Sequence, residues 1–188
     1  VNNNQFDQAL NHVNDLLDKN SNNPELHNIL GIIYLKKNKD NDAVNNFKKA
    51  IKLKKNFIHP YINISLIYRR QKLLDKALKY INYALEIDVN NEIIHINKGN
   101  ILKDLKQYQE SKESYLKAIE INNNISEAYN NLGTVLEKLN EFDYAIKNYE
   151  KSINLNPSFV PGYRNLIRLL DDLDSYTLAI KYIEKLLL

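Results

Sequence analysis

The sequence predicts an all-α protein of stacked amphipathic helices, and three observations support this. The chain of 188 residues repeats itself with a period of 34 residues. Apolar residues recur at steps of three and four, as in Leu132, Val135 and Leu136, which places them on one side of a helix. Four glycines and four prolines are too few for a sheet protein with many tight turns.

We treat the chain as one array of repeats. A half repeat at 1–23 precedes full repeats at 24–57, 58–91, 92–125 and 126–159, and a partial repeat follows at 160–188. Each full repeat is expected to hold two helices. Prolines agree with the expected starts, because Pro24, Pro60 and Pro161 fall in first turns, where a missing N–H costs little. The expected breaks between the two helices are Asn38–Lys39, Lys72–Leu73, Lys106–Gln107 and Asn140–Glu141.

Certain places in the repeat carry residues of one size, which indicates close helix packing. Small residues recur at the eighth, twentieth and twenty-seventh places, where they let two helix backbones approach. Branched and aromatic residues at the twenty-fourth place are expected to fill the space beside them. The eighth place holds Gly31, Ser65, Gly99, Gly133 and Ile167, and the twenty-fourth holds Val13, Phe47, Ile81, Tyr115, Tyr149 and Ile183.

This pattern resembles the tetratricopeptide repeat (TPR) family over essentially the whole chain. The segment Tyr129–Leu136, followed by Phe142–Tyr149 and then Asn156-Pro157, is similar to the motif of that family. Ile167 at a small place and Ser111 at an alanine place depart from it. The resemblance implies a right-handed α-solenoid of antiparallel helix pairs, whose first helices line a concave face.

Several functions are disfavoured by what the sequence lacks. There is no cysteine, no phosphate-binding loop and no His–carboxylate cluster at ligand spacing, so we expect neither enzyme activity, nor a cofactor, nor a metal. Repeat 24–57 holds eight lysines and three acidic residues, but its lysines are not interleaved with stacking aromatics, and we expect no nucleic-acid binding. No segment is apolar for the length of a membrane span. We expect a cytoplasmic protein.

The sixth place of the repeat is the strongest candidate for function. It reads Ile29, Asn63, Asn97, Asn131 and Asn165. The row is similar to the asparagine ladder in the TPR superhelix of O-linked N-acetylglucosamine transferases, and this resemblance implies amides that bind the backbone of an extended peptide. Abundant asparagine, 30 residues in this chain, is the alternative explanation. The full expected peptide-binding set is Asn63, Asn97, Asn100, Asn131, Asn165, Ile62, Leu66, Ile96, Arg164 and Arg168.

These observations predict a protein–protein interaction scaffold that binds an extended peptide in its concave groove. Apolar side chains of the peptide are expected at repeats 24–57 and 58–91, and an acidic group near Arg164 and Arg168. Two alternatives stay open: the repeats are the substrate-recruiting arm of a larger, glycosyltransferase-like transferase, or they are a structural assembly module. The last expected helix, Tyr176–Leu188, ends in apolar residues, so we expect a further helix or self-association through uncapped helix ends there.

Overall fold

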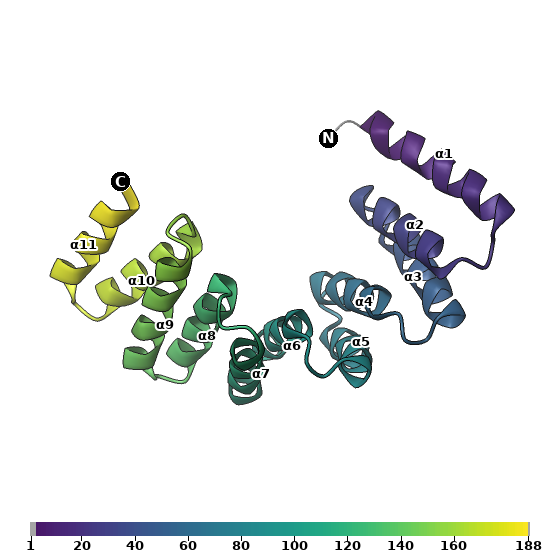
Figure 1. Ribbon diagram of the computed structural model, residues 1–188. Coiled ribbons are helices and arrows are strands. Elements are labelled where there is room, and N and C mark those ends of the chain that lie inside the picture. The colour runs from purple at the N-terminus through teal and green to yellow at the C-terminus, as the bar shows by residue number, and fades with distance from the viewer. Residues whose placement is uncertain (1–2, 188) are drawn as a thin grey trace. The chain divides into compact units, whose positions relative to one another are not determined.

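The computed structural model describes residues 3–187, and over these residues it contains eleven helices and no strand (Figure 1). The chain divides into two compact units, Val1–Val89 and Asn90–Leu188, each of which is described by itself. The all-α fold of helical repeats predicted from the sequence is confirmed. The helices of the first unit are α1 (Asn3–Lys19), α2 (Pro24–Lys36), α3 (Asp40–Leu53), α4 (Ile58–Arg70) and α5 (Leu74–Ile87). Those of the second unit are α6 (Glu92–Asp104), α7 (Tyr108–Ile121), α8 (Ser126–Lys138), α9 (Phe142–Leu155), α10 (Val160–Asp172) and α11 (Tyr176–Leu187).

The expected breaks between the two helices of each repeat are confirmed, and a recurring turn explains them. At the fifteenth place of each repeat the backbone has positive φ, at Asn38 (58°), Lys72 (61°), Lys106 (62°), Asn140 (60°) and Asp174 (55°). The N–H of the next residue donates to a carbonyl five residues earlier, as from Glu141 to Leu136 at 2.9 Å. This is the hydrogen-bond pattern of a Schellman motif, which ends one helix and turns the chain back toward the next.

Local side-chain bonds fix where two of the first helices begin. The side-chain oxygen of Asn23 accepts from the Leu26 N–H at 3.1 Å, and that of Asn91 accepts from the Ile94 N–H at 3.4 Å. Each asparagine side chain therefore caps one N–H group of the first helical turn, where the N–H groups lack partners inside the helix. Pro24, directly after the first of these caps, has no N–H to satisfy.

Within each pair, a small residue on the first helix faces a large residue on the second. The aromatic rings of Phe47, Tyr115 and Tyr149 lie so close to a glycine of the first helix that an added Cβ would come within 3.0 Å of them. In repeat 58–91 the combination is Ser65 with Ile81. A bulkier eighth place is thus accompanied by a smaller twenty-fourth place, as volume conservation in a packed core requires.

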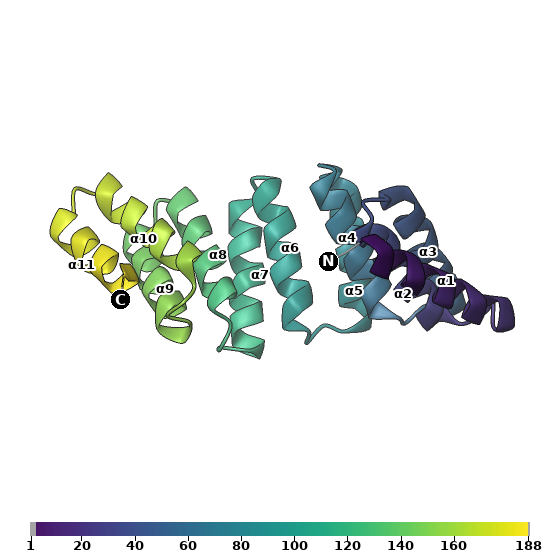
Figure 2. The same cartoon turned by 90° about the horizontal axis from the view of Figure 1, so that it is seen from above.

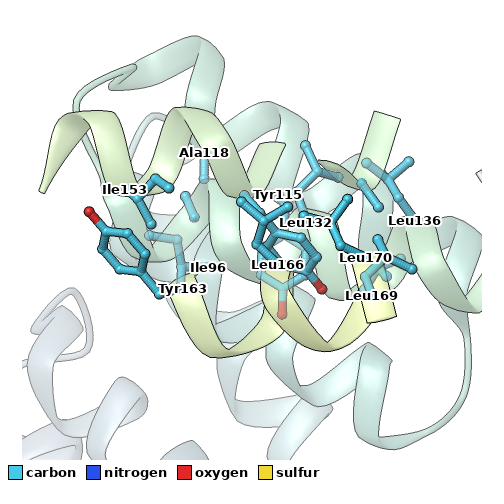
Figure 3. Close-up of a cluster of buried hydrophobic side chains, with 14 of the residues drawn as sticks. Ile96, Tyr115, Ala118, Leu132, Leu136, Ile153, Tyr163, Leu166, Leu169 and Leu170 are labelled. Carbon is cyan, nitrogen blue, oxygen red and sulfur yellow. The ribbon is translucent and has the colours of Figure 1, made fainter. Parts of the chain in front are cut away.

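One hydrophobic core joins the three helix pairs of the second unit, α6/α7, α8/α9 and α10/α11. Buried side chains of α8, α9 and α10 form one cluster with Ile96 of α6 and Tyr115 of α7. Figure 3 shows Leu166, Leu169 and Leu170 of α10 together with Leu132 and Leu136 of α8. In Figure 2, α6 and α7 lie side by side, as do α8 and α9, which agrees with the contacts within each pair. As a result, the first helices of the second unit lie next to one another in chain order, with α6 beside α8 and α8 beside α10.

Candidate amide row on the first helices

Five asparagines on the first helices of the second unit form what we call the amide row: Asn97 and Asn100 on α6, Asn130 and Asn131 on α8, and Asn165 on α10. Hydrogen bonds between their side chains connect neighbouring first helices. The Asn131 Nδ2 donates to Asn100 Oδ1 at 3.2 Å, and the Asn165 Nδ2 donates to Asn130 Oδ1 at 2.9 Å. Both bonds join residues more than 30 positions apart in the chain, so the row connects α6 to α8 and α8 to α10.

The amide row is also anchored to the second helix of the first pair. The buried Tyr115 hydroxyl donates to Asn100 Oδ1 at 2.7 Å, so this oxygen accepts from both α7 and α8. Asn97 is held differently, because its Nδ2 donates to the backbone carbonyl of Ile93 in its own helix at 2.9 Å. The geometry of the row is therefore set before any partner arrives.

This arrangement corrects one part of the sequence-based expectation. The sequence-based expectation is that the side chains of Asn97 and Asn131 at the sixth place point into solvent in the free protein. Instead Asn97, Asn131 and Asn165 are half-buried, and Asn100 of the ninth place is buried. The structure adds Asn130, a residue of the fifth place that the sequence-based set omitted. Two features of the sequence could have pointed to Asn130. It adjoins Asn131, and it lies 35 positions before Asn165.

The apolar residues of the predicted set do not form one exposed row. Ile96 is only 8% exposed and lies in the hydrophobic core of the second unit, so it packs inward rather than toward a groove. In the first unit, Leu66 on α4 is 37% exposed, while Ile62 and Asn63 of the same helix are half-buried. Ile29 and Ile32 on α2 are exposed as well. The first unit therefore presents apolar side chains on α2 and on α4, the first helices of its two full repeats.

The two predicted arginines have different surroundings. Arg168 on α10 is tied to carboxylates, donating to Glu137 Oε1 at 2.7 Å and to Asp172 Oδ2 at 2.9 Å. Hydrogen bonding to Glu137 raises the pKa of the Arg168 guanidinium, so its charge is retained but compensated. An acidic ligand would have to compete with these carboxylates. Arg164, by contrast, is exposed and offers its cation to solvent.

Glu137 is the centre of a small network that the sequence did not reveal. Its side chain is 11% exposed, and it accepts from the Tyr149 hydroxyl as well as from Arg168. Burial, followed by the hydrogen bond to Glu137, raises the pKa of the Tyr149 phenol. The network joins α8, α9 and α10, and Glu137, which also accepts from Tyr149, holds Arg168 in place rather than leaving it free to bind.

Two kinds of site find no support among the described residues. Over 3–187, no group of three or more His, Asp or Glu side chains is placed to hold a metal ion. No helix in that range combines the length and the apolar character needed to cross a bilayer.

Sequence comparison shows the family directly. Profiles of the tetratricopeptide repeat match residues 24–57, 58–91 and 126–159, and a further TPR repeat profile matches 99–140. Together with the helix pairs, these matches show that the chain belongs to the tetratricopeptide repeat family. The class of protein defined here is therefore a tetratricopeptide repeat protein. A search among curated proteins finds no match.

Solved structures of TPR proteins share the fold at low sequence identity. The crystal structure of MamA is 23% identical, with a TM-score of 0.75, over 84% of this chain and 92% of that one. PilF from Pseudomonas aeruginosa is 22% identical, with a TM-score of 0.79, over 87% and 74% of the two chains. YrrB, described as a TPR protein with an unusual peptide-binding site, is 17% identical, with a TM-score of 0.73, over 93% and 90%.

Proposed function

We propose that this chain is an interaction scaffold that binds an extended segment of a partner protein on its first helices. In the second unit, the amide row hydrogen-bonds to the backbone of that segment. The observation that carries the proposal is the hydrogen-bonded connection of amides from α6 through α8 to α10. A continuous line of polar groups on neighbouring helices matches the repeating polar groups of an extended peptide.

Amide chemistry suits backbone recognition. Each asparagine side chain has two N–H donors and one carbonyl acceptor, so it can pair with peptide N–H and C=O groups whatever the ligand side chains are. Asn97 and Asn165 each donate one bond within the protein, which orients the amide while its carbonyl oxygen remains an acceptor. Because the row is held in place, a ligand pays little of the ordering cost that a mobile site would impose.

Two further features support binding of a peptide with mixed side chains. The exposed Ile29 and Ile32 on α2 and Leu66 on α4 of the first unit each offer an apolar contact to such a ligand. Arg164 of the second unit offers a cation for an acidic side chain. The peptide-binding site described for YrrB, a protein of similar fold, agrees with this type of function.

The proposal is tested by selecting ligands and then altering one amide. Peptides are selected from a random dodecapeptide display library against the intact chain, and their affinities are measured by calorimetry. We expect Asn97→Ala to weaken the selected peptides by about 1–3 kcal/mol, because a peptide group loses its partner.

Asn148→Ala is the matched control. The Asn148 Nδ2 donates to the Tyr144 carbonyl of its own helix at 2.8 Å, much as Asn97 donates to Ile93, but it lies on the second helix α9. Equal losses in the two variants, or no loss in either, would remove the amide row from the binding mechanism. The substrate-recruiting arm of a larger transferase and the structural assembly module stay as alternative predictions.

A further inference from the structure

A second surface, separate from the amide row, lies between α10 and α11. A groove of about 630 Å³ is lined there by large apolar side chains, among them Val160, Ile167, Tyr176, Ile180, Ile183 and Leu186. Tyr176 and Ile180 are each 55% exposed. Single exposed apolar residues are common on protein surfaces, but a contiguous group of this size usually marks a place where something binds.

The repeat itself shows what kind of structure covers such a surface. One repeat earlier, the same places lie on α8 and α9, and α10 packs on both of these helices. There α10 buries Leu166 and Leu170 in the core, and it adds polar bonds at its edge, from Asn165 to Asn130 and from Arg168 to Glu137. The α10/α11 groove thus continues an established helix-binding surface, so its expected occupant is a helix.

The groove is not, however, a copy of the earlier surface. At the twenty-seventh place, the last repeat has Leu186 where the preceding repeat has Ser152. At the eighth place, it has Ile167 where the preceding repeat has Gly133. In the earlier pair the contact is close, since a Cβ on Gly162 of α10 would lie 2.8 Å from Ile153 Cγ2 and 3.4 Å from Ser152 Oγ. With Leu186 in the place of Ser152, an incoming helix must carry a small residue opposite Leu186. Its larger apolar residues would then reach Ile167, Ile180 and Ile183.

Charged residues at the rim make the requirement more specific. Asp171 stands at the place of Glu137, which pairs with Arg168, so a basic residue is expected opposite Asp171. Arg164 stands at the place of Asn130, which pairs with Asn165, so an acidic residue is expected opposite Arg164. Opposite charges in these places would favour one orientation of the bound helix and select against others.

From this geometry we propose that the α10/α11 groove binds an amphipathic helix of a partner protein in the orientation that α10 has on α8 and α9. The helix carries a small residue at the place of Gly162, an acid at that of Asn165, an apolar residue at that of Leu166 and a base at that of Arg168. This is recognition of a helix in a groove by spaced anchors. The α10/α11 groove shares α10 and Arg164 with the surface proposed for the extended segment, but none of the five asparagines of the amide row lines it, so the two proposals rest on different observations.

The probe is a fluorescein-labelled peptide with the sequence of α10, residues 160–172, carrying Asn165→Glu. Its binding to the intact chain is followed by fluorescence anisotropy. We expect saturable binding that Ile180→Asp weakens at least about ten-fold, because a charge would enter the apolar floor. Leu116→Asp is the control, since Leu116 on α7 is 46% exposed but lies outside the groove, and its effect should stay within about two-fold.

A charge exchange provides a second and independent measurement. Asp171→Arg should weaken the probe about ten-fold, and a probe that also carries Arg168→Glu should recover most of this loss. Circular dichroism checks that each variant is folded. No saturable binding, equal effects of Ile180→Asp and Leu116→Asp, or no recovery in the charge exchange would overturn the proposal. So would sedimentation showing a dimer that Ile180→Asp dissociates, since a second copy would then cover the groove.

Discussion

The close contact between Gly133 and Tyr149 gives the sharpest test of how the repeats pack. A Cβ added at Gly133 would lie 2.7, 2.9 and 3.0 Å from Cε1, Cδ1 and Cζ of the Tyr149 ring. The ring cannot easily move away, because it is fully buried and its hydroxyl donates to Glu137. Gly133→Ala should therefore lower stability by about 1–3 kcal/mol through overpacking. This outweighs the gain of up to about 1 kcal/mol that alanine brings to a helix interior.

A change in the partner residue should rescue this loss. Repeat 58–91 tolerates Ser65 at the eighth place beside Ile81 at the twenty-fourth. In the double variant Gly133→Ala/Tyr149→Ile, the smaller side chain at position 149 should likewise make room for the added methyl group.

The coupling between the two substitutions should be about 0.5–3 kcal/mol in favour of the double variant. Tyr149→Phe is the matched control, since it removes the hydroxyl but keeps the ring, and it should give little rescue of Gly133→Ala.

Urea denaturation followed by circular dichroism gives the free energies of unfolding, and hydrogen exchange locates the loss. Because each repeat contacts its neighbours alone, the exchange rates should rise mainly in 126–159 and the adjoining repeats. Strictly additive effects of Gly133→Ala and Tyr149→Ile, or a stabilising effect of Gly133→Ala, would refute the assigned contact.

Three further predictions concern single positions. Lys106→Gly should raise stability by about 1 kcal/mol in urea denaturation, because glycine adopts the positive φ of 62° without strain; a loss of stability would argue against this turn. Asn28→Ile should raise the melting temperature, because Asn28 Oδ1 is buried without a partner and two other repeats hold isoleucine at this place. Asn130→Ile, a change at the same place of another repeat, should lower the melting temperature by removing the bond to Asn165. Stability should also fall as pH rises above about 10, because the phenol of Tyr149 ionises there in the unfolded chain, whereas its raised pKa keeps it protonated in the folded protein. Urea midpoints measured from about pH 9 to pH 11 should show this fall, and they should fall less steeply in Tyr149→Phe.

The helix pairs and their breaks could be predicted because both depend on places within one repeat. The turn after the first helix uses a positive-φ residue at the same place each time, although that residue is Asn, Lys or Asp rather than Gly. The small-to-large pairing also recurs at a fixed distance, so Gly133 and Tyr149 could be matched from spacing alone. Features that repeat along the chain are visible in a sequence aligned with itself.

The candidate site was less predictable because its bonds join different places in neighbouring repeats. Asn131 of the sixth place bonds Asn100 of the ninth, and Asn165 of the sixth bonds Asn130 of the fifth. Arg168 was expected to be available, but Glu137, 31 residues earlier, holds it. These choices depend on distances between helices, which periodicity does not specify.

The central claim is that the amide row binds the backbone of an extended peptide, and backbone methylation of a selected peptide tests it most directly. Each peptide N–H of the ligand is replaced in turn by N-methyl, and every analogue is titrated by calorimetry against the intact chain and against Asn97→Ala. The account predicts that one or more methyl groups weaken binding to the intact chain by about 1–3 kcal/mol, and that at least one of these losses shrinks in Asn97→Ala, where the amide is already gone. Affinity that follows the ligand side chains and is the same for every methylated analogue would contradict the claim.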